Sequence, residues 1–209
     1  MNCKAIGYDM KSLQVELQHG ETFYCERGAI IYYEDGLNVK LNLLEAGIGN
    51  LLKRAMSGES PAHLEINNNS GRMRKLMVAG KVGLLPLDLK AWPGGIVCRG
   101  GYYIASTGKV DFDFKLSLSS FIGGTGPAFQ KLNGTCTVFL DSIGSSFSVE
   151  LGVGEMINVD EKSFICMSAS MQQSLKSNFS LKNMVGGEGL NMFQVSGPGT
   201  IYMNSVNLR

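Results

Sequence analysis

The sequence has little of what most enzyme and metal sites are built from. It contains two histidines, His19 and His63, and neither has further ligand-type residues near it at the spacing of a metal site. No serine lies in a GxSxG motif, and no GK[ST] sequence follows a glycine-rich turn. The sequence therefore predicts no catalytic residue, no metal site and no cofactor, and it favours a non-enzymatic protein over an enzyme.

Charge is scarce as well. Charged residues make up 18% of the chain, and 19 basic residues against 18 acidic residues give a formal net charge of +1. This balance provides little long-range attraction to nucleic acid or to an anionic membrane. The chain also lacks an uncharged apolar run of about 18 residues, so no membrane-spanning helix is expected.

The cysteines do not form a recognisable framework. There are five of them, no pair has CxxC spacing, and the first ten residues lack the apolar stretch of a signal peptide. We therefore expect a reducing, cytoplasmic setting in which the cysteines act as small buried hydrophobic residues.

What the sequence does have is a period-two pattern between glycine-rich turns. Apolar residues alternate with polar ones over residues 13–18, 37–43, 110–119 and 147–151. This period indicates strands with one buried face, and the 27 glycines suit tight turns between them. The sequence predicts an all-β fold with two packed antiparallel sheets per unit, closing towards a barrel or jelly roll.

The pattern occurs in three copies. Residues 20–33, 93–106 and 154–167 align so that Ile31, Ile104 and Ile165 fall at one equivalent position. Cys25, Cys98 and Val159 align six residues earlier, which indicates a site for a small buried side chain. We predict one compact domain over residues 1–209, made of three internal repeats at roughly 10–85, 86–145 and 146–209.

A glycine turn also recurs, as LLKRAMSGES, GGTG and GGEG. Glycine turns can bind anions through backbone N–H groups, but here a structural role in tight turns is favoured. The candidate residues are Gly58, Gly123, Gly124, Gly126, Gly186, Gly187 and Gly189.

Two further features leave binding functions open. A local basic patch is the strongest sign of nucleic-acid binding, although solvated surface charge is the more common reason for such a cluster. Its candidates are Lys53, Arg54, Arg72, Arg74 and Lys75. The aromatic pair Tyr32 and Tyr33 suits base stacking, strand packing or a subunit contact.

The three glycine turns resemble those of a known family, as do the central segments KVGLLPLDL and PGGIVCRGGYYIASTGKV and the terminal FQVSGPGTIYMNS. The family is the mitochondrial biogenesis family named for altered inheritance of mitochondria, with its bacterial homologues. The resemblance covers essentially the whole chain. It implies a fold like that of the trp RNA-binding attenuation protein, of the double-stranded β-helix type, with three β repeats around a pseudo-threefold axis. It also implies frequent assembly as a homotrimer, and no established activity for the bacterial members.

Three functions remain open at this point. The leading hypothesis is a non-enzymatic, oligomeric β scaffold that acts through an unknown protein partner, because pseudosymmetric repeats leave sheet edges that self-association can cover. The alternatives are an RNA-binding module and a small-ligand-binding protein with a pocket between repeats.

Overall fold

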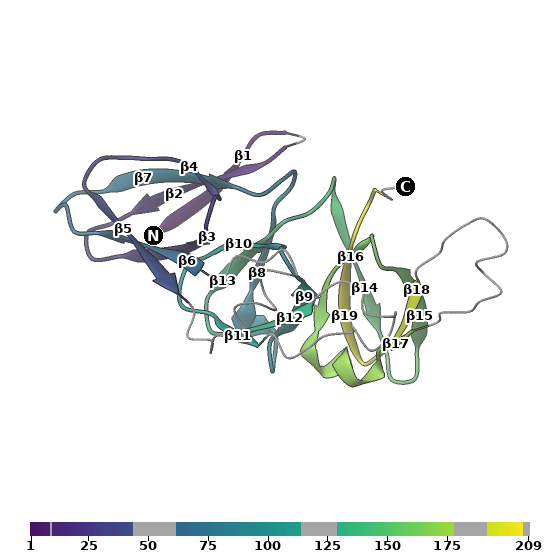
Figure 1. Ribbon diagram of the computed structural model, residues 1–209. Coiled ribbons are helices and arrows are strands. Elements are labelled where there is room, and N and C mark those ends of the chain that lie inside the picture. The colour runs from purple at the N-terminus through teal and green to yellow at the C-terminus, as the bar shows by residue number, and fades with distance from the viewer. Residues whose placement is uncertain (9, 44–61, 114–128, 178–191, 207–209) are drawn as a thin grey trace. The chain divides into compact units, whose positions relative to one another are not determined.

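A computed structural model of the chain describes residues 1–8, 10–43, 62–113, 129–177 and 192–206. Regular structure in these residues is almost entirely β-strand (Figure 1). The helical elements described are two short 3-10 helices, η1 (Leu89–Ala91) and η3 (Ala169–Ser174). The predicted all-β class is confirmed.

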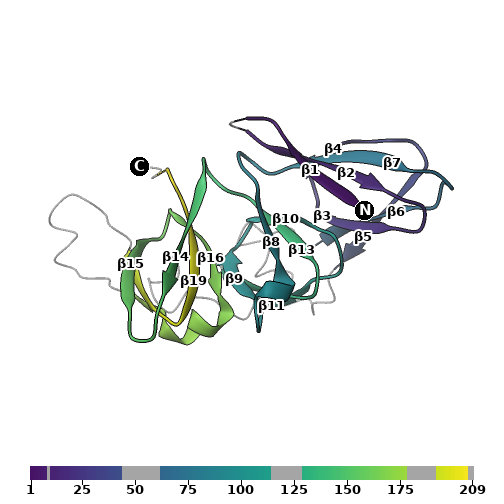
Figure 2. The same cartoon turned by 180° about the vertical axis from the view of Figure 1, so that it is seen from behind.

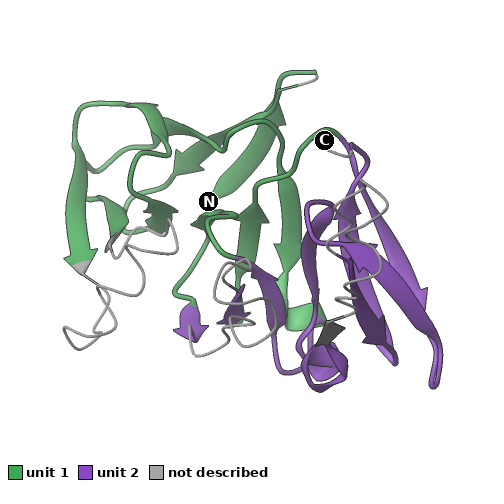
Figure 3. Ribbon diagram, turned by 45° about the vertical axis from the view of Figure 1, so that its right-hand side comes forward, with its two compact units in different colours: residues 1–91, 100–110, 134–144 green, residues 92–99, 111–133, 145–209 purple. Residues whose placement is uncertain are grey.

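The strands gather into two compact units (Figure 3). The first comprises residues 1–91, 100–110 and 134–144, and the second comprises residues 92–99, 111–133 and 145–209. Each unit is therefore assembled from three separate stretches of chain.

The first unit contains two sheets. One has the strand order β1-β2-β7-β4, and the other has the order β5-β6-β3-β10-β13-β8 (Figures 1 and 2). The strand bounds are β1 Asn2–Ile6, β2 Ser12–Leu17, β3 Thr22–Glu26, β4 Ile30–Tyr33, β5 Leu37–Leu43, β6 Ala62–Asn68, β7 Arg74–Ala79, β8 Leu85–Asp88, β10 Tyr103–Ser106 and β13 Thr137–Leu140.

Alternation along the strands builds the core of this unit. Leu13, Val15 and Leu17 of β2 are buried, while the residues between them are only partly buried. They share one hydrophobic cluster with Phe23 and Cys25 of β3 in the other sheet. The two sheets thus pack face to face, as the period-two pattern predicts.

The second unit is built in the same way from two other sheets. Their orders are β11-β12-β9-β16-β19-β14 and β15-β18-β17. The strand bounds are β9 Ile96–Arg99, β11 Asp111–Asp113, β12 Phe129–Asn133, β14 Ser146–Leu151, β15 Met156–Asp160, β16 Phe164–Ser168, β17 Lys176–Ser177, β18 Met192–Ser196 and β19 Gly199–Asn204. The core between them includes Phe129, Phe164 and Phe193, whose ring centroids lie 5.3 to 6.3 Å apart.

Closure of the sheets towards a barrel is not found in the described residues. Closure requires the first and last strands of a sheet to pair with each other. Each of the four sheets is instead open, with a different strand at either edge, such as β1 and β4 in the first sheet.

One strand order recurs along the chain. The series β2-β7-β4, β8-β13-β10 and β14-β19-β16 have the same order, with strand numbers that rise by six. The third strand of each series also has the same irregularity where it pairs with the second. The register shifts between Ile30 and Tyr32, between Tyr103 and Ala105, and between Phe164 and Cys166. The residue passed over is in each case the isoleucine that aligns in the sequence, Ile31, Ile104 or Ile165.

The turn before β9 provides a test of local backbone strain. Gly94 and Gly95 have φ angles of +79° and +88°, and a Cβ on Gly95 would run into the Leu132 carbonyl oxygen, whereas one on Gly94 would meet open space. We expect Gly94→Ala to lower the free energy of unfolding by about 1 kcal/mol through strain alone. Gly95→Ala should cost about 3 kcal/mol, because the backbone must also move. Urea unfolding followed by circular dichroism measures both, and equal losses would contradict the steric argument.

Candidate functional site

Many of the residues singled out from the sequence lie outside the described residues. These are the seven turn glycines, Gly58, Gly123, Gly124, Gly126, Gly186, Gly187 and Gly189, together with Lys53 and Arg54. Their roles stay predictions.

The rest of the basic patch lies in or next to β7. The Arg74 Nε donates a hydrogen bond to Ser70 Oγ at 2.9 Å, and the Lys75 Nζ lies 3.4 Å from Glu16 Oε1. Successive side chains of a strand point to opposite faces, so these two cations do not share a surface. Arg72 precedes the strand and is exposed.

Both histidines have contacts that suit a structural role. The Nδ1 of His19 accepts a hydrogen bond from the Gly71 N–H at 3.2 Å, and the His63 ring lies 5.0 Å from the Tyr103 ring. Within the described ranges, no group of three or more His, Cys, Asp or Glu residues is placed to hold a metal ion. None of the helices in those ranges combines the length and the apolar character of a membrane span.

The first unit has a pocket of about 680 Å³. Its lining includes the threonines Thr22, Thr107 and Thr137 and the thiol of Cys3. Burial raises the pKa of Cys3 to about 11, so this thiol is protonated near neutral pH and is a poor nucleophile. The lining therefore combines polar residues with apolar ones such as Pro86 and Phe139, a mixture that is common in small-ligand pockets.

The most unusual surface is the free side of β4. This strand reads Ile-Ile-Tyr-Tyr, and Ile31, Tyr32 and Tyr33 are all exposed. Among the described residues, β4 is the outer strand of its sheet and pairs with β7 on one side. An outer strand presents a row of backbone N–H and C=O groups that another strand can pair with.

The two strands that take the place of β4 in the recurring order, β10 and β16, are deeply buried. All four residues of β10 are buried, and so are the first four residues of β16. The reason is that β10 lies between β3 and β13, and β16 lies between β9 and β19. β4 has the apolar composition of such a central strand but the position of an edge strand.

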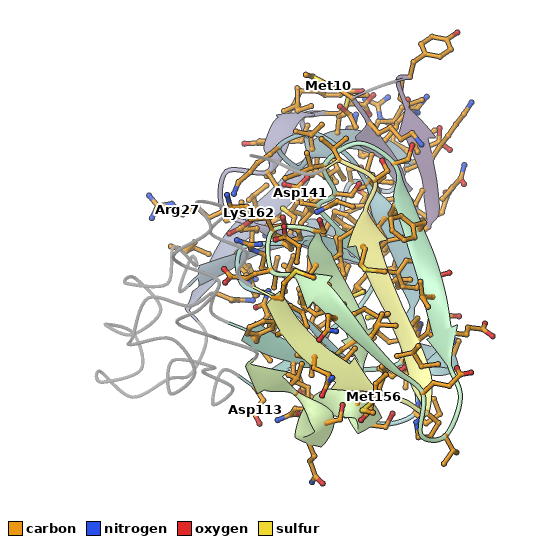
Figure 4. All side chains as sticks on the ribbon, turned by 90° about the vertical axis from the view of Figure 1, so that its right-hand side faces the viewer. Met10, Arg27, Asp113, Asp141, Met156 and Lys162 are labelled. Carbon is orange, nitrogen blue, oxygen red and sulfur yellow. The ribbon has the colours of Figure 1, made fainter. Side chains whose placement is uncertain are left out.

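A second open edge is formed by β15. In the part of the chain that the structure describes, this strand pairs with β18 and is the outer strand of its sheet. Its first residue, Met156, is a large exposed apolar side chain (Figure 4). The corresponding strands β3 and β9 each have a neighbour on both sides.

Edge strands of soluble proteins usually carry a lysine, a proline or an inward-pointing charge that discourages pairing with other chains. β4 has none of these. Sequence reasoning singled out Tyr32 and Tyr33 as a possible subunit contact, but it could not show that their strand is an edge. We take the outer sides of β4 and β15, named here the two open edges, as the candidate functional site.

Comparisons with known proteins match nearly the whole chain. An uncharacterized protein of Streptococcus pyogenes serotype M6 is 26% identical over 94% of this chain and 82% of its own length. A crystal structure of a Streptococcus pyogenes protein matches 99% of this chain and 94% of its own, with a TM-score of 0.74 and 21% identity, and thus shows the fold. A family model described as mitochondrial biogenesis AIM24 matches residues 3–206. The chain therefore belongs to the mitochondrial biogenesis AIM24 family.

Proposed function

We propose that this protein is a non-enzymatic β scaffold that assembles with copies of itself and acts through protein partners. The observation that carries the proposal is β4, whose exposed residues Ile31, Tyr32 and Tyr33 form an apolar strand at an open edge. Covering such an edge removes apolar surface from water and satisfies backbone hydrogen-bonding groups. Self-association achieves both.

The architecture in this proposal is one of three pseudosymmetric repeats, at roughly 10–85, 86–145 and 146–209, as in the trp RNA-binding attenuation protein. Its support is the strand order that recurs every six strands and the register shift at Ile31, Ile104 and Ile165. A homotrimer in a reducing, cytoplasmic setting completes the proposal. The five cysteines are consistent with that setting, since no disulfide joins them in the described residues, which include them all.

Small-ligand binding is the second candidate, because the first unit has a pocket of about 680 Å³ lined by both polar and apolar residues. RNA binding has weaker support, because Arg74 and Lys75 are engaged in local contacts.

The solution mass of the purified protein tests the proposal directly. Light scattering should give three times the 22.6 kDa of one chain, with the absorbance ratio at 260 and 280 nm typical of protein alone. A monomer at micromolar concentration would contradict the scaffold. Excess absorbance at 260 nm would favour the RNA-binding alternative, and a small molecule released on denaturation and detected by mass spectrometry would favour the ligand-binding one.

A further inference from the structure

We propose that the two open edges are the halves of one interface, so that β4 of one copy pairs antiparallel with β15 of the next copy in a defined register. This inference rests on the self-assembly proposed above and names the surface responsible. The partner is a second copy of this chain, because the chain forms the same kind of junction twice within itself.

The first internal junction joins β3 to β10. These strands pair antiparallel, with Cys25 opposite Ala105 and Tyr24 opposite Ser106. In the recurring order, β3 is the counterpart of β15, and β10 is the counterpart of β4.

The second internal junction joins β9 to β16. These strands also pair antiparallel, with Cys98 opposite Cys166 and Val97 opposite Met167. Both junctions therefore connect equivalent strands at equivalent residues. The register shifts in β10 and β16 place Ala105 and Cys166 at the same point of the pattern.

The same alignment fixes the register expected at the open edges. Val159 is equivalent to Cys25 and Cys98, and Tyr32 is equivalent to Ala105 and Cys166. Tyr32 should therefore lie opposite Val159 of the neighbouring copy. One residue further along, Tyr33 should lie opposite Asn158.

Burial supports the same pairing. The strands equivalent to β4 are buried because a neighbour covers their second side. β4 retains the apolar residues of such a strand, which are costly to leave in water and gain from a matching neighbour. Pairing with β15 would give β4 the neighbour that β10 and β16 already have.

The symmetry of this contact is head-to-tail. Each copy contributes one β4 and one β15, so the interface is heterologous and closes into a ring when the rotation between copies is a simple fraction of a turn. A ring of three copies would match the trimer proposed above.

Cysteine cross-linking tests the register between copies. Tyr33→Cys in a tagged chain and Asn158→Cys in an untagged chain are co-expressed and mildly oxidised. Both residues are exposed, so the substitutions should be tolerated. We expect a disulfide-linked species that contains one tagged and one untagged chain, because residues opposite each other in paired strands lie within disulfide reach.

The control pairs Tyr33→Cys with Ser148→Cys. Ser148 is also exposed, lies on β14, another outer strand among the described residues, and should give no mixed species. The wild-type chain, oxidised in parallel, reports any contribution of the native cysteines. Mixed species of equal yield from both pairs, or from neither, would overturn the proposed register. A single chain that carries both Tyr33→Cys and Asn158→Cys is oxidised as a further sample. A disulfide that forms only within that chain, and never between copies, would also overturn the register.

A second, independent test introduces a charge at the proposed interface and measures the mass of the protein. Ile31→Lys should shift the light-scattering mass of the protein to that of one chain, because a charged side chain would have to be buried at the interface. Leu41→Lys is the matched control: Leu41 is 53% exposed on the outer strand β5 and Ile31 is 56% exposed, so neither change should unfold the chain.

The outcomes separate the two proposals. A wild-type monomer would remove self-assembly and this interface together. A wild-type oligomer that survives Ile31→Lys and forms no Tyr33–Asn158 cross-link would leave the scaffold standing and overturn the pairing of β4 with β15.

Discussion

Phe164→Ala is expected to lower the free energy of unfolding by about 4 kcal/mol, the largest effect among the substitutions considered. Phe164 is 1% exposed in the core of the second unit. Its ring centroid lies 5.3 Å from that of Phe129 and 5.4 Å from that of Phe193, and the contact with Phe193 is edge-to-face. Truncation would lose this aromatic packing and leave a cavity between two sheets, which the surrounding strands can only partly fill.

Urea unfolding followed by far-ultraviolet circular dichroism measures this loss. Phe147→Ala is the matched control, because Phe147 lies on β14 in the same unit but is 48% exposed. We expect that control to change stability by no more than about 0.5 kcal/mol. Similar losses for both variants would show that the aromatic cluster does not carry the core of this unit.

Asp141→Ala should lower the free energy of unfolding by about 3 kcal/mol. The carboxylate of Asp141 is buried directly after β13 and accepts hydrogen bonds from the backbone N–H groups of Lys81 and Val82, at 3.0 and 3.3 Å. It thereby fixes the segment between β7 and β8. Gly80 makes room for it, because a Cβ there would lie 2.7 Å from Asp141 Oδ1. Removing the carboxylate leaves two backbone donors without their acceptors in a part-buried position.

The comparison with Asp141→Asn isolates the role of the second oxygen. The amide retains one acceptor but turns a donor towards the other N–H group, so we expect an intermediate loss in the same urea experiment. Asp111→Ala, at an exposed position on β11, should stay within about 0.5 kcal/mol of the wild type. If Asp141→Ala loses as little stability as Asp111→Ala, the connection between β7 and β8 is held by other contacts.

The all-β class could be predicted because it depends on a local signal. The alternation of Leu13, Val15 and Leu17 with polar residues survives in the structure as alternating burial. The identity of the edge strands depends instead on which strands pair, which is a property of the whole fold. The residues of β4, β10 and β16 are similarly apolar, and only the pairing leaves β4 exposed.

The role of Asp141 was equally hidden in the sequence. An acidic residue after an apolar strand is typical of an exposed turn, and nothing local shows that two backbone N–H groups some sixty residues earlier need an acceptor there. The short helix η3, with its buried Met171, was not predicted either. Its six residues, Ala169–Ser174, are too few to show a helical period.

The way in which the chain divides between its units limits how the protein can be taken apart. Neither unit is a continuous stretch, since the first resumes at residues 100–110 and 134–144 after the second has begun at residue 92. A gene fragment that stops at Ala91 would omit β10 and β13, which supply two inner strands to a sheet of the first unit. A fragment that starts at Trp92 would carry those two strands without the sheet to which they belong. Deletion mapping of partner binding would therefore damage the scaffold before it located a binding surface, and point substitutions on an intact chain are the sounder route.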